Sequence, residues 1–128
     1  MDYRKTLVVE PGRKMRLAEI DPGFHGQHET EEHAREDLAR FKEKMGAMQR
    51  LLYGDRSHAL LIVLQGIDAA GKDGTCWHVI GGMNPQGVTV TGFKAPTAEE
   101  RAHDFLWRVH RHAPARGEVA IFNRSHYE

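Results

Sequence analysis

Residues 66–75 of the chain, GIDAAGKDGT, contain residue types that bind phosphate, at a spacing that suits this role. Gly66 and Gly71 are separated by four residues, and Lys72 follows directly. Glycines let successive backbone N–H groups turn toward phosphate oxygens, and a lysine adds a full positive charge. The pattern predicts phosphate binding, with a chance glycine turn as the alternative. The residues expected to contact phosphate or nucleotide in this stretch are Gly66, Ala69, Ala70, Gly71, Lys72, Asp73, Gly74 and Thr75.

Two carboxylates in this stretch suggest a magnesium site. Asp73 stands where such loops usually carry Ser or Thr, and Asp68 lies inside the loop. Carboxylate oxygens are ligands that Mg²⁺ prefers, so we expect the ion between Asp68 and the substrate phosphates. Asp73 has a second explanation, as a solvated residue in the first turn of a helix, where negative charge is favoured. Both explanations stay open.

Three short apolar runs predict the strands of one sheet. They are ALLIVLQ (59–65), VTVTGF (88–93) and EVAIFN (118–123). A helical segment is predicted between each pair, and the order β-α-β-α-β indicates a mostly parallel sheet with helices on both faces. The predicted fold class is therefore α/β. Ligands of such sheets bind at the carboxyl ends of the strands, where the loop at 66–75 and the residues after 123 would meet.

The predicted helices differ in their signals. Apolar residues recur at steps of three and four across 30–54, which predicts one amphipathic helix that ends with Gly54 in a left-handed conformation. A second helix is expected over 72–80. Thr97 and Glu100 form a capping box that predicts a third helix running through Val109. The expected organisation is an irregular leader over 1–29, the amphipathic helix over 30–54 and a core over 55–128, together one domain.

Composition narrows the partners and the location. The 128 residues include 18 basic and 18 acidic side chains, so no global field favours nucleic acid or a membrane surface. No segment approaches the ~20 apolar residues of a membrane-spanning helix. Cys76 is the only cysteine, which suits a reducing compartment, and we expect a cytoplasmic protein.

Several segments together resemble the polyphosphate kinase 2 family. They are VLQGIDAAGKDGT, NPQGVTVTGFKAPT, DFLWRVHRHAP and GEVAIFNRSHYE, and the similarity runs over nearly the whole chain. The resemblance implies a P-loop kinase fold and Mg²⁺-dependent phosphoryl transfer between inorganic polyphosphate and a nucleotide. The expected direction is from polyphosphate to ADP or AMP, which yields ATP or ADP. The resemblance also suggests a homo-oligomer.

The same resemblance assigns roles to residues. It implies that 66–75 is the Walker A loop, with Asp68 and Lys72 essential. Arg124 would contact phosphates as a third catalytic residue, and the segment Asn123 to Glu128 would position metal and charge. The family continues well beyond this point, so we expect a P-loop kinase-like sheet truncated after its third core strand. Loss of activity through truncation is an open outcome.

Polyphosphate is a dense line of charge without a base, so its site should be a basic track. Basic residues cluster between Arg101 and Arg116, and Lys94 precedes them. A solvated, charged helix face is the alternative for each of these side chains. The residues expected on the track are Lys94, Arg108 and Arg111.

Two other functions fit parts of the pattern. A nucleoside monophosphate kinase that uses ATP has a similar loop, although such enzymes usually keep the Ser or Thr that Asp73 replaces. A non-catalytic phosphate-binding fragment would bind without turnover. Use of polyphosphate or ATP as the donor separates the first alternative from the polyphosphate kinase.

Overall fold

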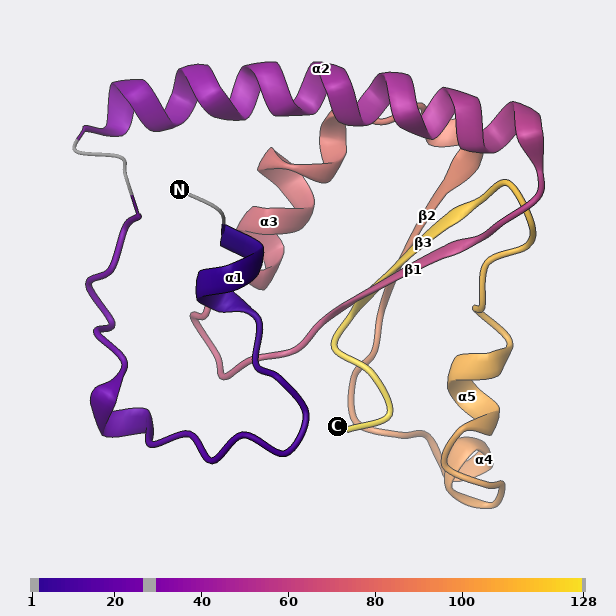
Figure 1. The fold of residues 1–128 in the computed structure, drawn as a ribbon. Coiled ribbons are helices and arrows are strands. Elements are labelled where there is room, and N and C mark those ends of the chain that lie inside the picture. Colours follow the sequence, from indigo (N-terminus) through magenta and orange to yellow (C-terminus); the bar gives the residue numbers. More distant parts are fainter. Residues whose placement is uncertain (1–2, 27–29, 128) are drawn as a thin grey trace. The chain divides into compact units, whose positions relative to one another are not determined.

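The structure, a computed structural model, describes residues 3–26 and 30–127 (Figure 1). Contacts divide the chain into two compact units, Met1–Asp37 and Leu38–Glu128. The first contains helix α1 (Tyr3–Leu7), the short 3₁₀ helix η1 (Leu17–Glu19) and the beginning of helix α2 (Glu31–Asp55). Most of its described side chains are exposed. The domain boundaries expected from the sequence stay predictions.

The second unit is built on a three-stranded sheet. Its strands are β1 (Leu60–Leu64), β2 (Val88–Gly92) and β3 (Val119–Asn123). Their spatial order is β1-β3-β2, and both pairings are parallel (Figure 1). This confirms the predicted parallel α/β sheet and places the last strand of the sequence in its centre.

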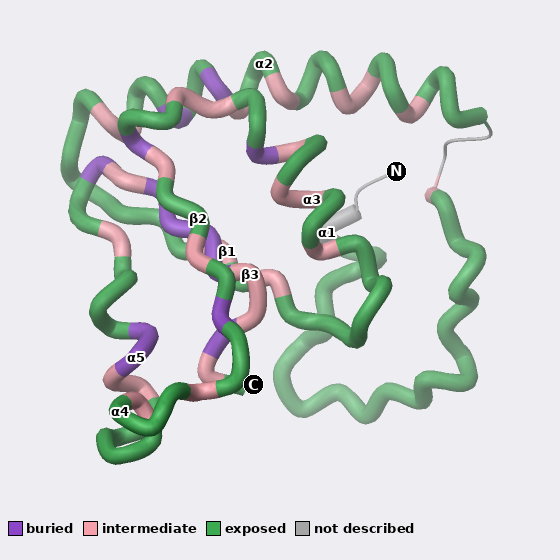
Figure 2. The backbone as a smooth tube through the Cα atoms, turned by 180° about the vertical axis from the view of Figure 1, so that it is seen from behind, coloured by how far each residue is buried: buried purple, intermediate pink, exposed green. Residues whose placement is uncertain are grey.

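Strand β3 carries the core on both faces of the sheet. Val119 and Ile121 face one side and Ala120 and Phe122 the other, because successive side chains of a strand alternate. All four are buried, and Figure 2 shows that burial is concentrated around this strand. Helix α5 (Trp107–His110) packs on the Phe122 face through Val109. The other face is covered from α2, from helix α3 (Lys72–His78) and from the chain that follows it, through Leu52, Cys76, Ile80 and Met83.

The helix predicted from Thr97 through Val109 is broken in two. Helix α4 (Ala98–Arg101) begins at the predicted capping box, in which the Thr97 hydroxyl accepts from the Glu100 N–H at 3.2 Å. Helix α5 begins only at Trp107. Between them the Asp104 carboxylate accepts from the Leu106 N–H at 3.0 Å. Local bonds of this kind compete with helical ones, and they explain the break.

The predicted end of α2 is also wrong in detail. Gly54 lies inside the helix, which ends at Asp55, and the left-handed residue is Arg56, with φ of 53°. The Asp55 carboxylate accepts from the Ser57 N–H at 3.3 Å, which turns the chain toward β1. An Asp side chain therefore supplies the turn that the glycine was expected to provide.

A close approach fixes α2 beside the segment that leads into β2. Helix α3 is followed by two 3₁₀ helices, η2 (Ile80–Gly82) and η3 (Pro85–Gly87). A Cβ atom on Gly87 would lie 2.6 Å from Nε2 of Gln49 and 2.7 Å from the Tyr53 ring. Only a glycine allows this contact, so Gly87 is needed to seat α2.

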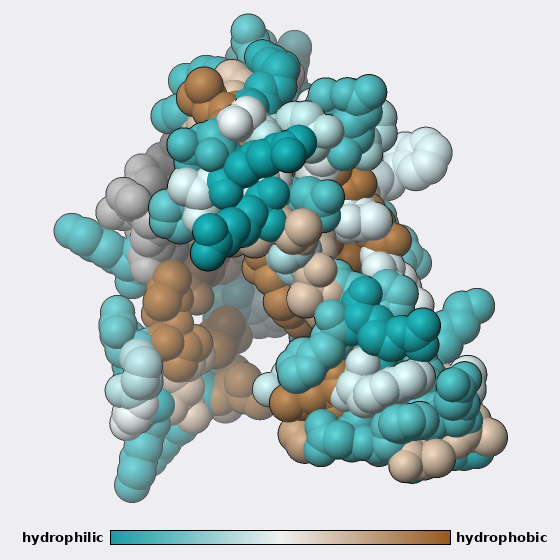
Figure 3. Space-filling view, turned by 90° about the vertical axis from the view of Figure 1, so that its right-hand side faces the viewer, coloured by the Kyte–Doolittle hydropathy of each residue, from teal (hydrophilic) through white to brown (hydrophobic). Residues whose placement is uncertain are grey.

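The surface contains hydrophobic side chains in several places. Figure 3 shows one side of the molecule, with hydrophobic patches between hydrophilic residues. Three of the exposed hydrophobic residues, Leu60, Leu61 and Val63, belong to strand β1. Within residues 3–26 and 30–127, no helix has the length and apolar character needed to span a membrane.

Candidate functional site

The glycine-rich loop, residues 66–75, connects β1 to α3 at the carboxyl end of the sheet. Two of its residues have left-handed backbones, Ala69 with φ of 64° and Gly71 with φ of 82°. These turns fold the loop around a cavity of about 250 Å³. The cavity is lined by Asp68, Ala69, Ala70, Gly71, Lys72, Asp73, Gly74 and Arg124.

Lys72 folds back over the loop. Its Nζ donates to the carbonyl oxygens of Gly66 and Ile67, at 2.8 Å each. These neutral acceptors are weaker partners for an ammonium group than phosphate oxygens are. The ammonium group is therefore held beside the cavity by bonds that a bound phosphate can replace.

Arg124 brings a second positive charge to the cavity from the other side. It follows β3 directly, its N–H donates to the Leu64 carbonyl at 2.9 Å, and its φ is 70°. Its Nη2 lies 2.7 Å from Oδ1 of Asp68, whose side chain is 90% exposed. A left-handed backbone at a residue other than glycine costs energy and is common at functional sites. The structure thus brings together Asp68, Lys72 and Arg124, the residues that the sequence singled out for catalysis.

Asp73 is held to the sheet rather than only solvated. Its Oδ1 accepts from Nδ2 of Asn123, the last residue of β3, at 2.5 Å. Oδ1 of Asn123 is buried without a hydrogen-bond partner among the described atoms. Thr75 does not replace the hydroxyl that Asp73 lacks, because its Oγ1 donates to the Gly71 carbonyl at 3.0 Å.

The oxygen ligands of the cavity suit a cation that is shared with phosphates. Asp68 and Asp73 both line it. Mg²⁺ is typically held by one or two carboxylates together with substrate phosphates and water. No group of three His, Cys, Asp or Glu residues with metal-binding geometry occurs in the described part of the chain. The donor set therefore fits a phosphate-bound Mg²⁺ rather than a site made by protein alone. Glu128, expected to help position metal, lies outside the described residues.

Arg108 is placed differently from the prediction. Its side chain is only 6% exposed, and its Nη2 donates to the Lys94 carbonyl at 2.6 Å. Its guanidinium lies 5.2 Å from the Phe93 ring, and its Nε is 3.6 Å from a Glu100 carboxylate oxygen. The expected contact with polyphosphate is corrected to an internal role, in which Arg108 ties α5 to the segment after β2.

The other predicted basic residues remain on the surface. Lys94 and Arg111 are exposed, and neither lines the cavity of the glycine-rich loop. The Arg111 guanidinium lies 4.9 Å from the Trp107 ring. Gly66 and Thr75 flank the cavity without lining it. Contacts of these residues with phosphate stay predictions.

Sequence reasoning did not identify a buried link below the site. Ser125 is buried, and its Oγ donates to Oε1 of Gln65 at 3.3 Å. This bond joins the segment after β3 to the start of the glycine-rich loop. A polar residue that ends an apolar strand, as Gln65 does, was the available signal.

Cys76 supplies no nucleophile to the site. Burial, with a further contribution from the charge of Asp73, raises the pKa of its thiol. A thiol with a raised pKa stays protonated at neutral pH and reacts slowly. The cavity therefore offers charge and hydrogen bonds for phosphate rather than a group for covalent catalysis.

Comparison with known proteins identifies relatives of this arrangement. The family described as polyphosphate kinase 2 matches residues 28–128. An ADP-polyphosphate phosphotransferase of Rhodopseudomonas palustris is 44% identical over 124 residues, which are 97% of this chain and 43% of that relative. An AMP/ADP-polyphosphate phosphotransferase of Meiothermus ruber is 46% identical over 128 residues, or 97% of this chain and 47% of that relative.

The fold agrees with these matches. The crystal structure of polyphosphate kinase 2 from Arthrobacter aurescens superimposes with a TM-score of 0.88 and 40% sequence identity. It covers 96% of this chain and 44% of the solved chain. The chain thus spans less than half the length of the relatives that it matches. Its sequence, its parallel sheet and its glycine-rich loop show that the chain belongs to the polyphosphate kinase 2 family.

Proposed function

We propose that this chain carries the phosphate-binding part of an enzyme that transfers phosphoryl groups between inorganic polyphosphate and ADP or AMP with Mg²⁺. The observation that carries the proposal is the convergence of Lys72 and Arg124 on one loop-lined cavity. The names of the relatives supply the substrate class, because they are ADP- and AMP/ADP-polyphosphate phosphotransferases. We propose ATP or ADP synthesis as the main direction.

The positive side chains bind phosphate by exchanging partners. Lys72 gives up its bonds to the Gly66 and Ile67 carbonyls and donates to phosphate oxygens instead. Arg124 turns part of its guanidinium from Asp68 to phosphate, which it can bind through two parallel hydrogen bonds. The N–H groups at the start of α3 add partial positive charge. Each group offsets charge on the oxygens of the transferring phosphoryl group.

The chemistry requires positioning more than proton transfer. A terminal oxygen of ADP attacks the terminal phosphorus of polyphosphate, the bridging P–O bond breaks, and polyphosphate leaves one phosphate shorter. The attacking oxygen is already ionised, so no general base is needed. Asp68 and Asp73 would hold Mg²⁺, which when bound neutralises charge on the reacting phosphates. The cavity of about 250 Å³ accommodates phosphate groups and leaves the nucleoside outside it.

The direct test is ATP formation from ADP, polyphosphate and Mg²⁺ by the purified chain. Lys72→Ala should abolish the ATP signal, while Lys14→Ala, which removes an exposed lysine of the first unit, should leave it unchanged. Equal ATP formation by wild type and Lys72→Ala would disprove the assigned role of the loop. Polyphosphate binding without ATP would favour a non-catalytic fragment.

The choice of donor separates the proposal from a nucleoside monophosphate kinase. With AMP as acceptor, the proposal expects polyphosphate to support ADP formation at a higher kcat/KM than ATP does. A preference for ATP would favour the alternative. The bond between Asp73 and Asn123 supports the proposal, because the carboxylate is a built part of the site. Homo-oligomeric assembly and a cytoplasmic location stay predictions.

A further inference from the structure

Strand β1 has the composition of an interior strand but the position of an edge strand. Its residues, LLIVL, are all aliphatic, like most of the central strand β3. The opposite edge strand, β2, reads VTVTG and alternates apolar and polar residues. Edge strands normally carry charges, proline or other features that prevent further pairing. Within the described residues, β1 pairs only with β3 and has none of these features.

Side chains on both faces of β1 are incompletely covered. Leu60 and Leu61 are 46% and 44% exposed, and they point to opposite faces of the sheet. The side chains of β3 at the same register, Val119 and Ala120, are buried. A purely aliphatic strand in a parallel sheet is normally covered on both faces. The exposed edge and faces of β1 therefore form one uncovered surface.

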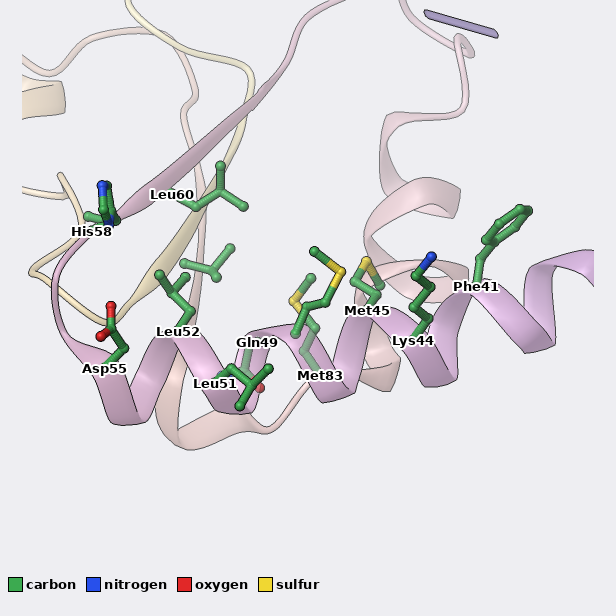
Figure 4. Close-up of a pocket in the computed structure, with 13 residues that line it drawn as sticks. Phe41, Lys44, Met45, Gln49, Leu51, Leu52, Asp55, His58, Leu60 and Met83 are labelled. Carbon is green, nitrogen blue, oxygen red and sulfur yellow. The ribbon is translucent and has the colours of Figure 1, made fainter. Parts of the chain in front are cut away.

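A groove beside β1 extends this surface along α2. Its cavity measures about 800 Å³ and is lined mostly by apolar side chains of α2 and β1. Figure 4 shows Leu52 and Leu60 facing the groove, with Asp55 and His58 at one end and Phe41 at the other. Leu51, which also lines it, is 73% exposed. The principal apolar lining residues are Phe41, Met45, Met48, Leu51, Leu52 and Leu60.

The length of the relatives indicates what covers the groove. Residues of this chain match only 43% and 47% of the two relatives described above, while the structural match to a polyphosphate kinase 2 has a TM-score of 0.88. More than half of each relative is therefore polypeptide that has no counterpart in this chain. Since the matched half leaves β1 uncovered, the unmatched half is the polypeptide available to pair with it.

We propose that the β1 edge and the α2–β1 groove are the docking surface for this second polypeptide, the part of the relatives that lies outside the match. It contributes a strand parallel to β1 and apolar side chains that fill the groove. The docking holds for a second polypeptide on the same chain or on a separate one. The inference rests on family membership and not on the proposed activity.

A second copy of this chain fits the surface less well. Two copies related by a two-fold axis would pair their β1 edges in antiparallel orientation. The aliphatic pattern of β1 is instead that of a parallel sheet covered on both faces, which one β1–β1 pairing would not provide. Self-association through β1 is therefore an outcome that the experiment must be able to detect.

The test uses the full 128-residue chain co-produced with the unmatched portion of the Meiothermus ruber relative. We expect co-purification as a 1:1 complex, measured by size-exclusion chromatography with light scattering, without nucleotide or polyphosphate. Leu51→Lys should weaken the complex at least tenfold. Leu17→Lys, at an 83% exposed leucine that does not line the groove, is the matched control and should bind as wild type does. The relative's own two parts, co-produced in the same way, verify that the second polypeptide is competent to bind.

Hydrogen exchange supplies a readout that needs no substitution. In the complex, the amides of 60–64 should exchange more slowly, while those of 88–92 should be unaffected, because β2 lies at the other edge. Absence of a complex with a competent second polypeptide would overturn the proposal. So would a complex that leaves exchange at 60–64 unchanged. A homodimer that Leu51→Lys dissociates, without binding of the second polypeptide, would overturn it in favour of self-association.

Discussion

Asp68 and Arg124 form an ion pair whose location suits function better than stability. The charged atoms lie 2.7 Å apart, but the Asp68 side chain is 90% exposed. Exposed ion pairs contribute about 0–1 kcal/mol to folding, because water screens them and side-chain entropy is lost. The Arg124 backbone is nevertheless held in a left-handed conformation. Retention of a strained backbone for a weak pair is consistent with a guanidinium placed for a ligand.

Substitution of Arg124 should separate activity from stability. In Arg124→Ala we expect kcat for ATP formation to fall by about 10²- to 10³-fold, as on removal of one charged or hydrogen-bonding group from a transition state. The free energy of unfolding should change by no more than about 1 kcal/mol, measured by urea denaturation. Arg35→Ala is the control, because it removes an exposed ion pair of the same 2.7 Å length from α2. A similar loss of activity in both variants would contradict the assignment.

The contrast between Arg108 and Arg124 shows how far residue types predict a site. Both are arginines near the predicted phosphate region, and the sequence favoured both as ligands. Arg124 follows a strand at the carboxyl edge of the sheet, where position alone indicates function. Arg108 lies in a stretch without clear periodicity, and its burial depends on the Lys94 carbonyl and Phe93, which are distant in sequence. Such long-range contacts are not encoded in local spacing.

At the scale of elements, the loop between β1 and α3 depends on backbone conformation. Gly71 has φ of 82°, and a Cβ atom there would meet no atom within 4 Å. Any penalty of substitution is therefore backbone strain and not a steric clash. Gly74, inside α3, also has open space around its Cβ position but no positive φ. The two glycines thus differ in conformation and share their open surroundings.

Alanine substitutions at these glycines should have opposite effects on stability. Gly71→Ala should lower the free energy of unfolding by about 1–2 kcal/mol, the cost of a left-handed backbone at a residue with a Cβ atom. Gly74→Ala should raise it by up to about 1 kcal/mol, because alanine favours a helix over glycine. Urea denaturation of both variants measures the difference. Destabilisation by Gly74→Ala that equals that of Gly71→Ala would disprove the conformational explanation.

The capping box at α4 should give the chain a specific pH dependence. A hydrogen bond from the Thr97 N–H, at 2.8 Å, holds the pKa of Glu100 below its ordinary value, and the charge of Arg108 acts in the same direction. A carboxyl whose pKa is lower in the folded state stabilises the fold above its unfolded pKa. This stabilisation is lost as the pH falls through the folded pKa.

Glu100→Gln should therefore destabilise the chain at neutral pH and much less in acid. We expect the difference in free energy of unfolding from wild type to shrink as the pH falls from about 7 to about 3. Glu99→Gln, in the same turn of α4, is the control and should show a smaller pH-dependent difference. Thermal unfolding at each pH provides the measurement. A difference that grows toward acid pH would contradict a lowered pKa of Glu100 in the folded chain.

The elements were largely predictable from the sequence, but their arrangement was not. Period-two and apolar patterns identified three strands, and the Thr97–Glu100 spacing identified a helix start. The order β1-β3-β2 depends on the handedness and length of crossovers, which no single segment contains. The break at Asp104 and the turn at Arg56 each depend on one side-chain hydrogen bond or one backbone angle near the helix end. Residue patterns do not resolve such local competition.

For the whole molecule, charge must act locally. The chain contains 18 basic and 18 acidic residues, so its net charge attracts no anion from a distance. Lys72 and Arg124 form a positive site whose field, at about 0.1 M salt, decays over about 10 Å. Binding of a polyanion should therefore depend on this cavity and weaken with ionic strength. It should also stabilise the folded chain, since the loop is assembled only when β1, α3 and β3 are in place.

Inorganic tripolyphosphate should accordingly raise the midpoint of thermal unfolding, Tm. A ligand at 100 times its Kd stabilises the state that binds it by about 2.7 kcal/mol. We expect the rise in Tm to shrink as NaCl is added, because salt screens the attraction. Lys72→Ala should abolish most of the rise, whereas Arg108→Met should lower the starting Tm and keep the ligand-induced rise, since Arg108 is buried away from the cavity. Differential scanning calorimetry of the three proteins at two salt concentrations provides the comparison. An equal rise in Lys72→Ala and wild type would show that tripolyphosphate binds elsewhere, and loss of the rise in Arg108→Met would restore that residue to the polyphosphate track.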